Sequence, residues 1–321
     1  MEYRRLGKAG VEVSRLCLGC MNFGGPTDEN DSLRIIDHAL DAGINFLDTE
    51  NVYTGGNSEA IVGKAIRDKR DRVVLATKVH WPVGKGPNRS GSSRYHIMQQ
   101  VEQSLRRLQT DHIDLYQLHR PDPDTPLEET LSALTDLVRQ GKVRYLGTSK
   151  FASWELCEAI WTARVHGFEP VVCDQPPYSI LGRRIENEVL PFCRKYGVGV
   201  IPFNPIAGGW LSGTYRRGQP LPAGSRGARM QWDLDSPRNR ALLDAVEALI
   251  PLAEELGTTL SRFAMAWILH NPDITSPITG PRTLDQLNET LEALNLEIPE
   301  PILERVDAIC PPGSDLRGYY Q

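Results

Sequence analysis

Hydrophobic positions in the chain form short apolar runs that alternate with longer amphipathic stretches. The apolar runs are of strand length, whereas residues 93–108 carry Val101, Leu105 and Leu108 at helical spacing. This pattern predicts a hairpin over residues 1–13, strands at 15–19, 45–49, 72–79, 112–119, 143–149, 171–175, 197–203 and 274–280, and helices at 30–42, 58–68, 93–108, 126–140, 154–166, 183–196, 236–256, 260–270 and 284–294. The alternation indicates an α/β fold of eight strand-helix units, one of them with an extra helix.

Eight such units can form an open doubly wound sheet or a closed barrel. No Gly-x-Gly-x-x-Gly follows the first strand, so the dinucleotide fingerprint of the open sheet is absent. Polar residues recur at the carboxyl ends of successive strands, which a barrel gathers on one face. We therefore expect a single (β/α)8 TIM barrel over residues 1–321 with an N-terminal β-hairpin. The segment 299–321, with a short helix, is expected to pack over the barrel or close part of the site.

Candidate chemistry lies at three successive strand ends. Asp48 ends one strand and Tyr53 follows it on a loop, Lys78 stands near the end of the next, and His119 ends the third. Taken singly, each residue has an ordinary structural explanation. Asp48 could be a loop cap, Tyr53 a half-buried aromatic residue, Lys78 a solvated charge, and His119 a capping or core histidine. Their ordered occurrence on one expected rim favours an acid/base site.

This set resembles the Asp/Tyr/Lys/His tetrad of the aldo-keto reductase family, in the same order, from about residue 5 to about residue 294. The resemblance implies the barrel fold and a nicotinamide cofactor, NADP(H), bound without the Rossmann fingerprint. Reducing a carbonyl with hydride leaves an alkoxide, so a proton donor is needed, and Tyr53 is the candidate. We expect Lys78 to lower the pKa of that phenol, Asp48 to hold the lysine charged, and His119 to polarise the carbonyl.

The resemblance also implies a set of cofactor-binding residues. Ser149 and Gln175 match residues that hold the nicotinamide carboxamide, whereas Lys150 replaces the usual Asn and can donate but not accept a hydrogen bond. Without the family pattern, strand-end hydrogen bonding would explain Ser149 and Gln175 equally well. The full expected set is Gly19, Met21, Asp48, Ser149, Gln175, Asn204, Pro205, Ile206, Ala207, Gly208, Ser225, Arg226, Gly280, Arg282, Gln286, Glu289 and Thr290.

The later members of this set fall in three segments, one of which is Ser225 and Arg226 in the loop 218–235, where Arg226 resembles the basic residue that helps close over the cofactor. Residues 203–213 resemble a pyrophosphate-wrapping turn, with Asn204 in place of the usual Ser and Thr214 where a phosphate-binding lysine often stands; the loop 218–235 beside it is expected to be a mobile surface excursion. Residues 280–290 resemble the adenosine-binding turn, with Thr290 in place of an Asn. There a helix N-terminus and Arg282 would favour a 2′-phosphate, hence NADPH over NADH. Candidate pocket-lining groups are Met21, Trp81, Trp210 and Trp232, although core packing is the more usual role of such residues.

Composition narrows the partners and the compartment. The net charge of −5 gives no reason to expect nucleic acid, and no apolar run is long enough for a membrane span. The six cysteines include one Cys-x-x-Cys pair, Cys17 and Cys20, on a strand where side chains three apart point to opposite faces; we expect buried free thiols and no metal site. With no signal peptide in sight, the cytoplasm is the expected location.

Three functions remain open on the sequence. The favoured one is an NADPH-dependent reductase of a small-molecule aldehyde or ketone, and a variant of it is a ketoreductase of a nucleotide-linked deoxysugar. The alternative from another class is an NADPH-binding regulatory subunit that resembles potassium-channel β subunits. The chain starts only a few residues before its first hairpin, with no arm for a channel to receive, which favours the enzyme. The substrate, the direction of reaction and the oligomeric state stay open.

Overall fold

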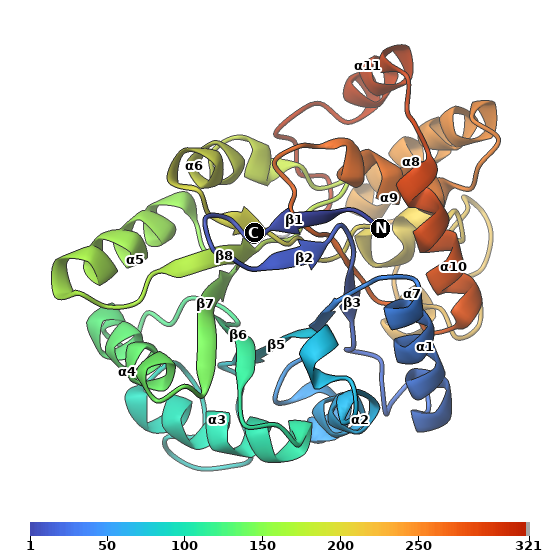
Figure 1. Cartoon of the computed structure of the whole chain (residues 1–321). Coiled ribbons are helices and arrows are strands. Elements are labelled where there is room, and N and C mark those ends of the chain that lie inside the picture. Colours follow the sequence, from blue (N-terminus) through green and yellow to red (C-terminus); the bar gives the residue numbers. More distant parts are fainter. Residues whose placement is uncertain (319–321) are drawn as a thin grey trace.

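The structure is a computed structural model that describes residues 1–318, and its centre is a parallel sheet of eight strands (Figure 1). The strands are β3 (Cys17–Gly19), β4 (Phe46–Asp48), β5 (Val74–Val79), β6 (Ile113–Leu118), β7 (Val143–Ser149), β8 (Val171–Gln175), β9 (Gly199–Val200) and β10 (Ile278–Thr279), in the order β10-β3-β4-β5-β6-β7-β8-β9. The backbone N–H groups of Thr275 and Ile278 donate to the carbonyls of Val200 and Pro202, each over 2.8 Å. These bonds join β10 to β9 and close the barrel, as predicted.

Helices surround this barrel on its outside (Figure 1). They are α1 (Glu29–Asp41), α2 (Asn57–Ile66), α3 (Arg94–Leu108), α4 (Leu127–Arg139), α5 (Ser153–His166), α6 (Val189–Tyr196), α7 (Arg226–Arg229), α8 (Pro237–Glu255), α9 (Leu260–His270), α10 (Leu284–Glu292) and α11 (Glu300–Ile309). Side chains of Asp28, Ser93, Ser236, Thr259 and Thr283 accept a hydrogen bond from the backbone of the first turn of their helices, which fixes where these helices begin.

Alternate strand residues supply two separate hydrophobic layers. The barrel interior holds a small cluster that includes Cys17, Phe46, Ala76 and Leu115, and a larger layer fills the space between the strands and the helices. Cys17 belongs to the interior cluster and Cys20 to the outer layer, so the Cys-x-x-Cys pair does point to opposite faces. The cysteines are buried or half-buried free thiols.

A β-hairpin closes the amino-terminal end of the barrel. Its strands are β1 (Tyr3–Arg5) and β2 (Glu12–Ser14), and Leu6 and Val13 are buried in the interior cluster. Gly7 has φ 61°, and a Cβ there would lie 2.6 Å from backbone atoms of Val172, Gly197 and Gly199. Only glycine fits this close approach, which seals one end and leaves the carboxyl ends of the strands open for a site.

Some expected elements are shorter or divided in the structure. The helix expected over 183–196 is a short 3-10 turn, Arg184–Glu186, followed by α6, and the strands expected over 197–203 and 274–280 are reduced to β9 and β10. The loop 218–235 contains α7, and Trp232 in it stacks on Trp210 with ring centroids 5.1 Å apart. In the expected C-terminal segment α11 is present, and residues 319–321 lie outside the described part of the chain.

Candidate active site

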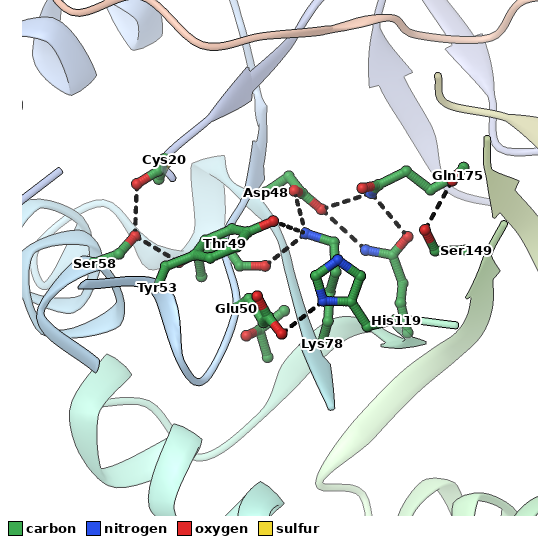
Figure 2. A network of polar contacts seen from close by, with 12 residues as sticks. Cys20, Asp48, Thr49, Glu50, Tyr53, Ser58, Lys78, His119, Ser149 and Gln175 are labelled. Carbon is green, nitrogen blue, oxygen red and sulfur yellow. Dashed lines mark hydrogen bonds and ion pairs between the residues drawn. The ribbon is translucent and has the colours of Figure 1, made fainter. Parts of the chain in front are cut away.

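Asp48 is the centre of a buried polar network at the open end of the barrel (Figure 2). It ends β4, and its Oδ1 accepts a hydrogen bond from Lys78 Nζ of β5 over 2.5 Å, while its Oδ2 accepts from Gln117 and Gln175, each over 3.0 Å. Lys78 Nζ also donates to the carbonyl of Thr49 over 2.9 Å. Burial alone would lower the pKa of Lys78, but the acidic groups around it, Asp48 first, raise it above its usual value. Lys78 therefore keeps its charge.

Tyr53 reaches this network from the loop after β4. Tyr53 begins a 3-10 turn, Tyr53–Gly56, and its hydroxyl lies 3.5 Å from Lys78 Nζ. The loop is held in place by Thr54, whose hydroxyl donates to the carbonyl of Phe23 over 2.8 Å. Burial raises the pKa of Tyr53, and the Lys78 ammonium opposes that rise. The Lys78 ammonium thus lowers the phenol pKa as expected, but desolvation outweighs it, so the net pKa of Tyr53 is raised.

His119 follows β6 and lies beside Tyr53, with ring centroids 6.2 Å apart and the planes nearly perpendicular. Its Nδ1 is 2.6 Å from Oε1 of Glu50, a carboxyl group that is only 1% exposed. Burial is the main cause that lowers the pKa of His119, to about 3, and that raises the pKa of Glu50, to about 8. Both shifts favour uncharged groups at neutral pH.

The structure therefore brings the four candidate catalytic residues together, and it adds two partners that the sequence did not single out. The Gln117 side chain donates a hydrogen bond to Asp48. Gln117 lies on β6 two residues before His119, and residues two apart on a strand point to the same face. This alternation is the sequence signal that could have identified Gln117. Glu50 stands in a loop, where no periodicity predicts the direction of its side chain.

On the next strand ends, Ser149 and Gln175 are buried neighbours. Ser149 Oγ donates to the carbonyl of Gln175 over 2.8 Å, and the Gln175 amide reaches both Asp48 and Gln117. Lys150 follows in a left-handed backbone conformation, φ 61°, with its Nζ 5.5 Å from the centre of the Phe203 ring. Burial and the neighbouring Arg120 lower the pKa of Lys150.

A turn after β9 gathers left-handed backbone and arginine side chains. Asn204, Ala207 and Gly208 have φ of 68°, 52° and 70°, and a Cβ at Gly208 would meet Arg317 and Arg226 at 3.6 and 3.7 Å. Pro205 and Ile206 complete the turn, and Ser225 caps α7 by accepting from the N–H of Ala228. A glycine turn beside two guanidinium groups suits a phosphate group. Arg317, far along the chain, gave no sequence signal for this placement.

A second turn lies between β10 and α10. The backbone N–H of Arg282 donates to Gln286 Oε1 over 2.8 Å, and Thr283 caps α10. Asn22, from the loop after β3, donates to the carbonyl of Gly280 over 3.1 Å. Further along α10, Glu289 accepts a hydrogen bond from Thr259, and Thr290 pairs with Thr279 over 3.2 Å. Glu289 therefore ties α10 to the start of α9, and Thr290 ties α10 to β10.

The remaining candidates have different surroundings. Gly19 faces β10, since a Cβ there would lie 2.6 Å from Ile278, and Met21 is 48% exposed. Trp81 packs edge-on against His119 with centroids 5.8 Å apart, so it borders the site. Trp210 is fully buried under Trp232, so its expected place in the pocket lining is wrong and it is a core residue.

These residues fit a dinucleotide. The Gly208 turn offers backbone groups and two arginines, the start of α10 offers a helix N-terminus preceded by Arg282, and polar side chains stand between them at the strand ends. The first two features favour phosphate groups, and the third favours an amide.

Comparison with known proteins decides the family, because the sequence matches the aldo/keto reductase family over residues 15–310. The chain belongs to the aldo/keto reductase family. It is 43% identical to an uncharacterized oxidoreductase, YrpG, of Bacillus subtilis, over 98% of both chains. It is also 38% identical to a probable voltage-gated potassium channel subunit beta of Oryza sativa, over 96% of both chains, and 38% identical to one of Arabidopsis thaliana, over 92% of both.

Family and relatives place this aldo/keto reductase among the oxidoreductases by sequence. The expected family is thereby confirmed. Across residues 1–318, none of the helices combines the length and the apolar character that a membrane crossing requires.

Proposed function

We propose that this aldo/keto reductase is an NADPH-dependent oxidoreductase that reduces a small-molecule aldehyde or ketone to the alcohol. The observation that carries the proposal is the chain of contacts Tyr53–Lys78–Asp48, with 3.5 Å from the phenol oxygen to the ammonium nitrogen and 2.5 Å from that nitrogen to the carboxylate. A phenol next to a buried, permanently charged ammonium is a proton donor whose conjugate base is stabilised.

When bound, the cofactor supplies a hydride to the carbonyl carbon. The carbonyl oxygen, which receives the electron pair of the C=O bond, then takes the proton of Tyr53. Lys78 stabilises the phenolate that remains, and Asp48 keeps the ammonium in place. Solvent returns a proton to Tyr53, so one carbonyl, one hydride and one proton give one alcohol.

Cofactor choice is assigned to Arg282 at the start of α10. Fluorescence titration should show tighter binding of NADPH than of NADH, and Arg282→Ala should narrow that difference, because the guanidinium would pair with the 2′-phosphate. Arg305→Ala is the control, since Arg305 pairs with Glu255 on the outer helices. Equal affinity of the unmodified protein for both cofactors contradicts the assignment.

The potassium channel subunits among the relatives favour a second candidate, a cofactor-binding regulatory subunit. A panel of aldehydes, ketones and nucleotide-linked keto sugars, followed by NADPH absorbance, separates the two. Oxidation of NADPH with any of these carbonyls supports the enzyme and narrows the substrate class. Tight NADPH binding with no turnover of any carbonyl supports the regulatory subunit.

A further inference from the structure

Glu50 is a buried carboxyl group that touches a catalytic candidate. It lies two residues after Asp48, and Figure 2 shows its side chain directed at the His119 ring. Oε1 is 2.6 Å from Nδ1 of His119, and Oε2 has no hydrogen-bond partner within residues 1–318. A carboxyl group that is 1% exposed is costly to bury, so its direct contact with the histidine calls for a role.

We propose that Glu50 is a positioning residue that fixes the tautomer of His119, holding its proton on Nε2, the nitrogen left to face the substrate carbonyl. The inference rests on the proposed function, because it concerns the same reaction. A protonated Glu50 donates its O–H to Nδ1, which makes Nδ1 the acceptor and leaves the ring hydrogen on Nε2. An ionised Glu50 can only accept, which moves the hydrogen to Nδ1 and leaves Nε2 without one to donate.

The charges around the pair decide which form is present. Burial raises the pKa of Glu50 to about 8; Lys78 of β5 and Lys150 after β7 oppose the rise, and Asp48 of β4 adds to it. The imidazole does not take up the proton instead, because burial, Lys78, Lys150 and Arg120 lower its pKa to about 3, although Asp48 acts in the opposite direction. At neutral pH the donating form of Glu50 therefore predominates.

Tyr53, Lys78 and Lys150 carry basic or phenolic groups beside the site, and a test in alkali must separate their titration from that of Glu50. Tyr53 and Lys78 both have pKa values raised above their usual ones, so they do not change charge between pH 7 and pH 10. Lys150 has a lowered pKa and can lose its charge in alkali. A change at residue 50 that leaves Lys150 intact separates the two.

Glu50→Gln is the decisive variant, because the amide N–H donates to Nδ1 at every pH. In the unmodified protein, the single-turnover rate of carbonyl reduction should fall roughly tenfold for each pH unit above about pH 8. Glu50→Gln should stay within about threefold of the parent rate at pH 6.5 and lack the alkaline fall. Glu50→Ala should be about 10–100-fold slower at pH 6.5, as expected on losing a residue that orients a histidine. NADPH affinity should stay the same in both variants.

Glu59→Gln is the control for removing a buried carboxylate, because Glu59 is fully buried and, within residues 1–318, hydrogen-bonds Thr77 and Arg107 but no histidine. It should keep the alkaline fall. An alkaline fall that survives in Glu50→Gln overturns the proposal, and so does a Glu50→Gln rate at pH 6.5 as low as that of Glu50→Ala.

Imidazole nitrogen chemical shifts give a readout that does not need turnover. The His119 signal, assigned by its loss in His119→Gln, should show Nε2–H at pH 6.5 and Nδ1–H at pH 9.5, and only Nε2–H in Glu50→Gln. Nδ1–H at pH 6.5 in the parent protein refutes the tautomer assignment. If no carbonyl is reduced, the proposed function fails and these shifts still decide the Glu50 inference.

Discussion

The Asp48 side chain at the centre of the site is held by neighbours that hydrogen-bond both of its oxygens. Both Asp48 oxygens accept, from Lys78 on one side and from Gln117 and Gln175 on the other. Because a buried ion pair without such partners would be unstable, the two glutamines, which bond the carboxylate oxygen that Lys78 does not reach, support the pair. The charge on Lys78 is therefore a fixed feature of the pocket, and its effect on Tyr53 can be tested directly.

Tyr53→Phe keeps the ring and its packing but removes the proton that is donated. Single-turnover hydride transfer should fall by about 100-fold or more, while NADPH affinity measured by fluorescence stays nearly unchanged. Lys78→Met should be similarly slow, because the phenolate loses its ammonium. Since the two residues act through one contact, the double variant should cost much less than the sum of both single losses. Fully additive losses, or a parent-like rate in Tyr53→Phe, contradict this coupling.

Lys150 has a left-handed backbone conformation, which is unfavourable for a residue with a long side chain. At φ 61° a lysine costs about 1 kcal/mol relative to a residue that tolerates the left-handed region, such as asparagine. Lys150→Asn should raise the free energy of unfolding in urea by about 0.5–1 kcal/mol. Lys150→Gln is the matched variant, because it removes the charge and keeps the strain, and it should bring no such gain. A gain of equal size in both would attribute the effect to charge.

At the scale of elements, proline explains the largest departures of the structure from the predicted pattern. The strands at 143–149 and 171–175 and the helix at 260–270 have the predicted bounds, because their apolar patterns run unbroken. Pro191 clashes with a helical carbonyl four residues earlier, so the predicted long helix restarts at α6 and places the proline in its first turn. Pro202 and Pro277 lack an N–H, which shortens β9 and β10 to two residues each.

In the site, too, the sequence predicts the positions of some residues and not of others. Strand ends are predictable, so the sequence alone places Asp48, Lys78 and His119 on one rim. Loop geometry is not, and the direction of the Glu50 side chain and the return of Arg317 to Gly208 depend on contacts between distant segments.

In the hairpin that closes the barrel, we expect two glycines to differ strongly in their tolerance of alanine. Gly7→Ala should lower the free energy of unfolding by about 2–3 kcal/mol, because its φ is 61° and the new Cβ would lie 2.6 Å from three backbone atoms. Gly10→Ala, in the same turn but with nothing within 4 Å of the new Cβ, should change it by less than about 0.5 kcal/mol. Urea unfolding measures both, and similar losses would mean that the turn has no close approach.

Over the whole molecule, buried carboxyl groups make stability depend on pH. Asp174 of β8 is fully buried, and burial raises its pKa to about 7, although Thr148 donates to it over 2.8 Å. A carboxyl group whose pKa is higher in the folded than in the unfolded protein stabilises fully below its unfolded value of 3.8 and loses that contribution as the pH rises to about 7.

Asp174→Asn removes this titration while an amide oxygen can still accept from Thr148. The variant should therefore gain stability relative to the parent as the pH rises from 4 to 8, by up to a few kcal/mol in urea unfolding. A difference in free energy that stays constant between these two pH values would show that the Asp174 carboxyl group has the same pKa in the folded and the unfolded protein.

The contact between the hairpin and the barrel floor also constrains the order of assembly during synthesis. Gly7 packs on Val172, Gly197 and Gly199, more than half the chain away, so the hairpin, which is synthesised before β8 and β9, has no complete docking surface until both have followed. At roughly 5–20 residues per second, Leu6 and Val13 wait on the order of ten seconds or more with their apolar side chains uncovered. Chaperones are thus expected to bind the hairpin segment of the newborn chain until β8 and β9 have been synthesised.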